Sequence, residues 1–163
     1  MLYLIIRYYQ KNNSTMTSKK ISNHQFVAID GDDVGLKLRD KIIANDIVNV
    51  QLLSSDITDF FLTLKTLLVG EGYKIVFCGG DSILAIGEEE SSIKLFNEFP
   101  KGPCTVSVGI SETAEQAYLA LQLAKARGKN QVVNITKTTV STIYDWSDHS
   151  FNKRKAQTYL AFP

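Results

Sequence analysis

Hydrophobic residues follow the two-residue period of half-buried strands, or form short apolar runs, in five segments of the chain. These segments are residues 25–30, 73–78, 83–86, 104–110 and 131–135. Only Gly79, Gly80, Asp81 and Ser82 separate the second run from the third. Glycines at such a short connection are typical of a β-hairpin, so we expect these two strands to pair antiparallel.

Helical spacing lies between the strands. The clearest predicted helix spans residues 54–72, where apolar residues recur every three or four positions. Its expected caps are Ser54, Ser55 or Asp56 at the start and Gly70 or Gly72 at the end. Further helices are expected after an N-cap at Asp32 or Asp33, over 91–99, and from a capping box at Thr113–Gln116 to about Arg127, with Gly128 as the stop.

The order of these elements is β-α-α-β-β-α-β-α-β. It contains a β-α-β-β-α-β core, which predicts an α+β, two-layer, ferredoxin-like fold with an antiparallel sheet and helices on one face. A doubly wound parallel sheet is the alternative, and the Gly79–Gly80 corner favours the hairpin of the first model.

Three regions are expected along the chain. Residues 1–24 are largely polar and without period after the first few positions, which is typical of a flexible leader or N-terminal extension. Met16 is an alternative start of the natural protein. Residues 25–136 form the predicted domain, and residues 137–163 extend it, with a further strand in TVSTIYDW and a loop plus helix as one interpretation of the rest.

Composition narrows the function classes. The formal net charge of +1 gives no basic field for wrapping polymeric nucleic acid. No segment reaches the roughly 20 apolar residues of a membrane-spanning helix. Cys78 and Cys104 lie in apolar strands and are interpreted as core residues in a reducing compartment. We therefore expect a soluble, cytoplasmic protein.

Two carboxylates are predicted to meet at one end of the sheet. Asp30 ends the first strand and Asp81 stands at the hairpin corner, and the predicted fold places these strands side by side. Paired carboxylates repel unless a cation neutralises them, and Mg²⁺ prefers a few carboxylates with water and phosphate oxygens. The carbonyl of Gly31 is the expected third ligand.

Each of these features also has a structural interpretation. Gly79 and Gly80 serve a turn that needs positive φ, a close approach of backbone N–H groups to a nucleotide, or both at once. Asp32 and Asp33 are typical helix caps. A calcium loop starting at Asp30 fails at its fifth and twelfth positions, Val34 and Lys41.

Two lysines follow in the segment LALQLAKARGKNQV. Lys125 lies in the last predicted turn of its helix, and Lys129 follows Gly128. Cations are favourable at a helix C-terminus through the dipole, which is the structural interpretation. Because the next strand returns to the sheet end that carries the carboxylates, both lysines are also candidates for binding a triphosphate.

Three segments together resemble a known family: FVAIDGDDVG, FCGGDSILA and TVSVGISETAEQAYLALQLAKARGKNQV. They are similar to the catalytic palm of GGDEF nucleotidyl cyclases and of type III CRISPR polymerases, and most of all to the minimal CRISPR polymerase family, mCpol. The resemblance covers about residues 25–136. It implies a palm that binds two Mg²⁺ or Mn²⁺ ions per site and joins nucleoside triphosphates.

The resemblance also implies roles for individual residues. Asp30, Asp81 and the Gly31 carbonyl match the metal ligands, and Lys125 matches the triphosphate-binding lysine. The remaining matches to the nucleotide site are Gly79, Gly80, Ser82, Asp33 and Lys129. At the position of Lys129 the cyclases usually have arginine.

The chain departs from the cyclase pattern at Ser82, where the GGDEF motif is acidic. The carboxylate thought to help deprotonate the attacking hydroxyl is therefore missing, and either Asp32 or Asp33 is a candidate catalytic substitute, unless metal activation suffices. The asparagine that reads guanine has no match either. Candidates near the base are Ser55, Asp56 and Asp59.

The family context implies a nucleotidyltransferase that makes a cyclic oligonucleotide signal, a cyclic dinucleotide from ATP, in phage defence. A homo-oligomer and a separate effector that senses the product are its expected partners, with neither membrane nor polymeric nucleic acid. The alternatives are a degenerate palm that binds a nucleotide without turnover and a hydrolase that opens the guanine ring of GTP. A purely structural module would leave the pairing of Asp30 with Asp81 unexplained.

Overall fold

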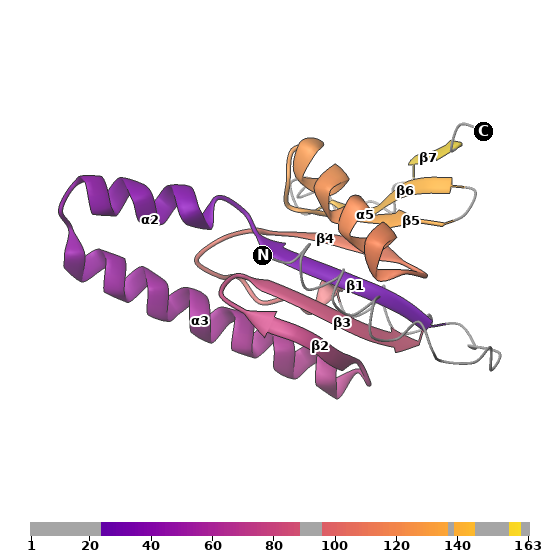
Figure 1. Cartoon of the computed structure of the whole chain (residues 1–163), viewed down its shortest axis with the longest axis horizontal. Helices are drawn as coiled ribbons and strands as arrows, with labels where there is room; N and C mark the ends of the chain where they lie inside the picture. Colours follow the sequence, from indigo (N-terminus) through magenta and orange to yellow (C-terminus); the bar gives the residue numbers. More distant parts are fainter. Residues whose placement is uncertain (1–23, 89–95, 137–138, 146–156, 161–163) are drawn as a thin grey trace.

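The described residues of the computed structural model, 24–88, 96–136, 139–145 and 157–160, build one mixed sheet with helices on both faces (Figure 1). The sheet order within this part of the chain is β2-β3-β1-β4-β5-β6-β7. Its strands are β1 (His24–Gly31), β2 (Lys74–Gly79), β3 (Ser82–Glu88), β4 (Val106–Ser111), β5 (Gln131–Ile135), β6 (Thr139–Asp145) and β7 (Gln157–Leu160). The helices are α2 (Val34–Ile43), α3 (Ile47–Gly70) and α5 (Ala114–Ala126).

The central strand β1 fixes the register of the site. It pairs antiparallel with β3 on one side and with β4 on the other. Asp30 is thereby opposite Ser82 in β3 and opposite Ser107 in β4. Because β2 and β3 form a hairpin, its corner at Gly80 and Asp81 lies at the same end of the sheet as the end of β1.

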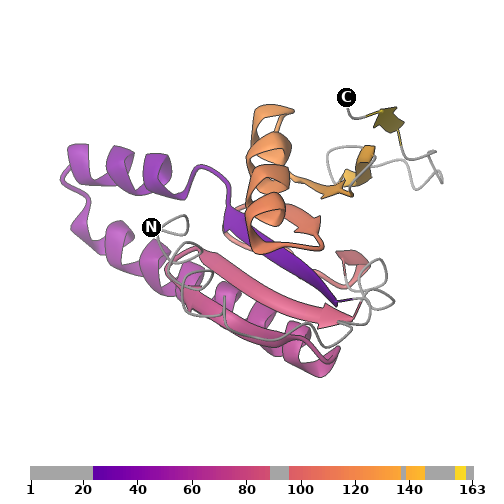
Figure 2. The same cartoon turned by 45° about the vertical axis from the view of Figure 1, so that its right-hand side comes forward.

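Helices lie on both faces of the sheet (Figure 2). The core accordingly has a layer of buried side chains on each face. On one face, α3 buries Phe61, Leu64 and Leu68 against strand residues that include Val27 and Ile29. On the other face, α5 packs against Ala28 and Leu84 of the sheet. The α5 residues in this contact are Ala114, Ala117 and Leu121. Alternate residues of β1 therefore face opposite helices, as the strand period requires.

The predicted ferredoxin-like order is confirmed, because β2-β3-β1-β4 is an antiparallel sheet of that topology. The doubly wound alternative is excluded by the β2–β3 hairpin. Two details differ from the prediction. The sheet is mixed, since α5 is a crossover that brings β5 parallel to β4. The same crossover puts α5 on the face opposite α3, so the helices do not share one face.

Among the described helices, the clear error in the predicted boundaries is the start of α3. Helix α3 ends at Gly70, but it begins at Ile47 after an Asp46 cap that accepts from the Asn49 N–H at 3.3 Å. Ser54, Ser55 and Asp56 are therefore inside the helix, and the prediction that they cap it is wrong. The early turns do not give a one-sided pattern, because Ile47, Val48 and Leu52 are exposed apolar residues.

The other helix starts combine expected and unexpected contacts. Asp33 takes the N-cap position of α2 at φ 60°, without a side-chain cap bond. Thr113 caps α5 by accepting from the Gln116 N–H at 3.2 Å, while the Gln116 side chain accepts from Ser111 instead of closing the box. Gly128 follows α5 at φ 117°, as predicted.

The tail adds strands to the sheet. The predicted strand in TVSTIYDW is confirmed as β6. A second strand, β7, pairs with it where a helix was one interpretation. The expected leader, except His24, and most of the expected helix over 91–99 lie outside the described residues. Among the described helices, none is both long enough and apolar enough to cross a bilayer.

Candidate active site

The end of β1 and the hairpin corner meet through the backbone. The Gly31 N–H donates to the Asp81 carbonyl at 2.8 Å. A Cβ at position 31 would lie 2.7 Å from Cγ2 of Val34 and 3.2 Å from Cβ of Asp81, so only glycine lets the chain pass the corner this closely. The structure thus brings together Asp30, Gly31 and Asp81, the three residues that the sequence suggests as metal ligands.

Asp81 lies in an environment that disfavours its charge. Burial raises the pKa of the Asp81 carboxyl group, and the negative charge of Asp30 raises it further. Such a pair of carboxylates fits a divalent cation, which would neutralise both. Among the described residues, no group of three or more His, Cys, Asp or Glu side chains is placed to hold a metal ion. The donor set that fits is therefore two carboxylates with the Gly31 carbonyl, completed by water or phosphate oxygens.

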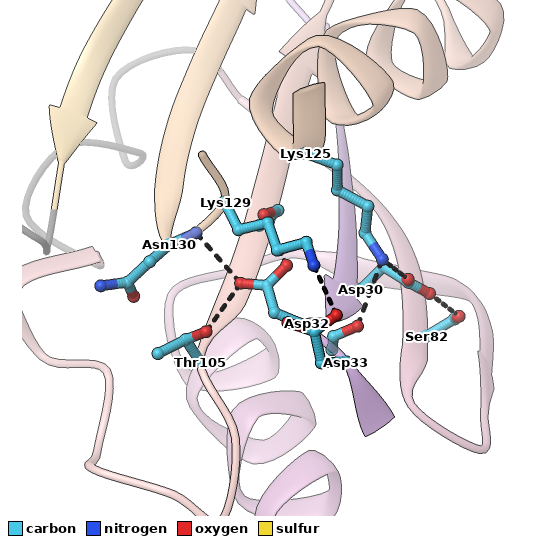
Figure 3. A network of polar contacts seen from close by, with 10 residues as sticks. Asp30, Asp32, Asp33, Ser82, Thr105, Lys125, Lys129 and Asn130 are labelled. Atoms are coloured by element: carbon cyan, nitrogen blue, oxygen red, sulfur yellow. Dashed lines mark hydrogen bonds and ion pairs between the residues drawn. The ribbon is translucent and has the colours of Figure 1, made fainter. Parts of the chain in front are cut away.

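Lys125 reaches into this donor set from the last turn of α5 (Figure 3). Its ammonium group pairs with Oδ2 of Asp30 and donates to the Gly31 carbonyl oxygen at 3.2 Å. The hydroxyl of Ser82, directly across the β1–β3 ladder, donates to Oδ1 of Asp30. Both oxygens of Asp30 are therefore held by neighbours from different elements.

A second lysine lies at the outer side of the site. Lys129 pairs with Asp33, and both residues have left-handed backbones, at φ 67° and φ 60°. The hydrogen bond from Lys129 lowers the pKa of the Asp33 carboxyl group. Since both side chains are about two-fifths exposed, this pair faces solvent.

Asp32 differs from its neighbours because its side chain is turned inward. Asp32 is 2% exposed. Its Oδ1 accepts from the Ser107 hydroxyl at 2.7 Å, and its Oδ2 accepts from the Thr105 hydroxyl at 2.9 Å and the Asn130 N–H at 3.0 Å. Sequence reasoning missed these three partners. The visible signal was the polar residues 105 and 107 within an otherwise apolar strand segment.

The glycines of the corner have different roles. Gly80 has φ 60°, so the turn requires glycine-like freedom there, as predicted. Gly79 belongs to β2, and a Cβ on it would come within 3.1 Å of the Phe77 ring. Ser55, Asp56 and Asp59, the candidates for base contacts, occupy exposed positions in the middle of α3.

Comparison with protein families decides what kind of domain carries this site. Residues 26–135 match the family model described as mCpol, minimal CRISPR polymerase domain. The chain belongs to the mCpol family. Family membership makes this a palm of the polymerase and nucleotidyl cyclase type.

A solved structure shares the fold of the mCpol domain. A Csm1-Csm4 cassette in complex with one ATP matches with a TM-score of 0.56 and 19% identity, over 68% of this chain and 20% of that chain. The mCpol chain thus spans only a fifth of that relative. An EAL/GGDEF domain protein from M. capsulatus matches with a TM-score of 0.48 and 19% identity, over 71% of this chain and 86% of that chain. A diguanylate cyclase/phosphodiesterase from Caldicellulosiruptor saccharolyticus matches with a TM-score of 0.49 and 16% identity, over 82% of this chain and 86% of that chain. No curated protein matches.

Proposed function

We propose that this mCpol domain is a Mg²⁺- or Mn²⁺-dependent nucleotidyltransferase. It joins nucleoside triphosphates, with ATP as the favoured substrate, into a cyclic oligonucleotide signal, a cyclic dinucleotide in the simplest case. The observation that carries this proposal is the meeting of Asp30, the Gly31 carbonyl and Asp81 at one strand end, with Lys125 and Lys129 beside them.

Each residue has a defined task in this proposal. Asp30, Asp81 and the Gly31 carbonyl would hold two divalent cations, which lower the pKa of the attacking ribose hydroxyl and neutralise the leaving pyrophosphate. Ser82 orients Asp30 through its hydrogen bond. Lys125 and Lys129 exchange their carboxylate partners for phosphate oxygens, and Gly79 and Gly80 leave room for the nucleotide at the corner.

The product implies a second copy of the chain. One palm presents one triphosphate, so closing a ring of two nucleotides needs two facing sites. The α2–α3 hairpin, which projects beyond the sheet in both ribbon views (Figures 1 and 2), begins directly after Asp33 and so flanks the site. It exposes a set of large apolar side chains: Leu36, Ile42, Ile43, Ile47, Val48 and Leu52. We therefore assign this surface to a second copy.

The setting of the reaction is also part of the proposal. Residues 25–136 act as the palm, and residues 137–163 extend the same domain, in keeping with β6 and β7 joining its sheet. The protein works in the cytoplasm in phage defence, without a membrane or polymeric nucleic acid, and a separate effector reads the product.

The direct test is to incubate the protein with each nucleoside triphosphate and Mg²⁺ or Mn²⁺ and to identify products by mass spectrometry. A cyclic product with release of pyrophosphate supports the proposal. Asp30→Ala and Asp81→Ala should abolish the product, while Glu115→Ala, at an exposed position in the first turn of α5, should not. Pyrophosphate-free turnover of GTP would instead indicate a ring-opening hydrolase.

Ser82 favours one other candidate, a palm that binds a nucleotide without turnover. A hydroxyl stands where the cyclases carry a carboxylate, and it is committed to Asp30. Saturable ATP binding without any product, under all metal conditions, would select this candidate.

A further inference from the structure

Asp32 joins three parts of the chain that are far apart in sequence. It follows β1 directly, and its partners Thr105 and Ser107 lie 73 and 75 residues away, at the start of β4. Its third donor, the Asn130 N–H, lies 98 residues away between α5 and β5. In addition, the Asp32 N–H donates to the Thr105 carbonyl at 2.8 Å, so the backbone is fixed at the same point as the side chain.

The segment that Asn130 belongs to has an unusual backbone. Gly128, Lys129 and Asn130 have φ values of 117°, 67° and 50°, three left-handed residues in succession. This conformation is unfavourable for residues with a Cβ, so it must be stabilised by contacts outside the turn. Three such contacts are the Lys129 N–H bond to the Ala124 carbonyl at 3.0 Å, the Gln131 side-chain amide bond to the Lys129 carbonyl at 3.3 Å, and the Asn130 N–H bond to Asp32.

The turn determines where the Lys129 side chain points. With Asn130 held by Asp32, the ammonium group of Lys129 reaches Asp33 at the outer side of the site (Figure 3). Releasing the Asn130 N–H would free the turn to adopt other backbone conformations, and Lys129 would lose its fixed direction. The effect of Asp32 on the site is therefore transmitted through Lys129.

We propose that Asp32 is a positioning residue, which holds the turn 128–130 so that Lys129 faces the triphosphate. This proposal rests on the proposed function, because it takes Lys129 as a triphosphate ligand. It replaces the expectation that Asp32 substitutes for the missing GGDEF carboxylate. A general base must reach the hydroxyl that it deprotonates, whereas both oxygens of Asp32 are buried and already accept protein hydrogen bonds.

Two substitutions separate positioning from base catalysis. Asp32→Asn keeps an acceptor for the Asn130 N–H, and its amide can donate to the Ser107 hydroxyl, but it cannot act as a base. Asp32→Ala removes the acceptor for the Asn130 N–H and also the carboxylate that could act as a base. Positioning predicts that Asp32→Asn retains ATP affinity and turnover within about threefold, while Asp32→Ala weakens ATP binding about tenfold. Loss of turnover in Asp32→Asn with unchanged ATP affinity would overturn the proposal.

A double-mutant cycle with Lys129→Met tests the route of the effect. If Asp32 acts through Lys129, Asp32→Ala adds nothing to the loss of ATP affinity already caused by Lys129→Met. Additive losses would contradict the proposal. Glu115→Gln, at an exposed position in the first turn of α5, is the matched control and should change neither quantity.

Hydrogen exchange of the Asn130 amide in the nucleotide-free protein gives a readout that needs no activity. Positioning predicts fast exchange in Asp32→Ala and slow exchange, as in the wild type, in Asp32→Asn. If Asp32→Ala fails to fold, the comparison of Asp32→Asn with the wild type still decides between a base and a positioning residue. A wild-type protein that binds no ATP would refute the proposed function, whereas an Asn130 amide that is unprotected in the wild type would refute the role of Asp32.

Discussion

The ammonium group of Lys125 pairs with the carboxylate of Asp30, 95 residues away, and bonds the adjacent Gly31 carbonyl at 3.2 Å. Lys125 therefore neutralises one of the three groups that fit a metal ion, the Asp30 carboxylate, and hydrogen-bonds a second, the Gly31 carbonyl. In the proposed function, Asp30 would hold a divalent cation in place of this ammonium group, and Lys125 would then be available to bind phosphate oxygens. Metal binding and triphosphate binding should accordingly favour each other.

Replacing Lys125 with methionine should tighten Mn²⁺ binding to the nucleotide-free protein about tenfold, because the competing cation is removed. The same change should weaken ATP binding. Both affinities are measurable, the first by electron paramagnetic resonance titration and the second by calorimetry. Lys74→Met, at the exposed far end of β2, is the matched control and should leave both unchanged. Unchanged or weaker Mn²⁺ binding in Lys125→Met would contradict this competition.

The Ser82 hydroxyl should act on metal affinity by orienting Asp30. Loss of a hydrogen bond to a ligating group commonly costs about 10–100-fold in metal affinity. We therefore expect Ser82→Ala to weaken Mn²⁺ binding by about this factor without unfolding the protein, measured by the same titration. Ser54→Ala, exposed on α3, serves as the control. An Mn²⁺ affinity equal to that of the wild type would mean that Asp30 needs no such orientation.

The ionised carboxylate of Asp81 should lower the free energy of unfolding of the metal-free protein. The pKa of Asp81 is raised in the folded state, first by burial and then by Asp30. The folded protein therefore holds this proton to higher pH than the unfolded chain, so stability falls as pH rises through the window that starts at the ordinary aspartate pKa of about 3.9.

Asp81→Asn removes this cost. In the presence of a chelator, urea unfolding should show the variant to be more stable than the wild type at neutral pH. The difference should vanish below the ordinary aspartate pKa of about 3.9, where both folded and unfolded states are protonated. Excess Mg²⁺ should stabilise the wild type and not the variant. A variant less stable than the wild type at neutral pH would indicate that Asp81 is already compensated by the protein.

Gly109 determines how closely α5 approaches the sheet, and so where Lys125 lies. A Cβ at this position would lie 2.1 Å from the Ala117 carbonyl oxygen and 2.2 Å from the Leu121 nitrogen. Gly109→Ala should destabilise the protein by about 1–3 kcal/mol or more, because backbone atoms cannot move aside singly. The control is Gly35→Ala in α2, where nothing lies within 4 Å and a gain of about 0.5–1 kcal/mol is expected. Equal unfolding midpoints of the two variants would contradict this account.

The exposed apolar surface of the α2–α3 hairpin should mediate self-association. Val48 is 67% exposed, and an aspartate there would bring an unpaired charge into an interface between copies. We expect the wild type to be a dimer by light scattering and Val48→Asp to be a monomer that binds ATP but forms no cyclic product. Val69→Asp, at the opposite end of the same helix and 54% exposed, should remain dimeric. A monomeric wild type that makes the product would refute this assignment.

Much of the fold and of the candidate site can be predicted from the sequence, because it depends on the conformational preferences of adjacent residues. Strand and helix periods, the turn at Gly80 and the stop at Gly128 follow from the conformational limits of a few adjacent residues. The closeness of Asp30 and Asp81 follows from these local elements once the hairpin is paired with the first strand. The start of α3 at Ile47 could not be predicted from the sequence, because the exposed apolar residues there leave no one-sided pattern.

The amino-acid sequence by itself therefore determined which residues end the strands and which carry charge at those ends. The tertiary structure alone decided that Asp32 turns inward to Ser107 and Asn130, that α5 covers the face opposite α3, and that Lys125 pairs with Asp30. These relations join residues up to 98 positions apart. They depend on how the crossover packs against the sheet, and no periodicity within a single segment carries that information.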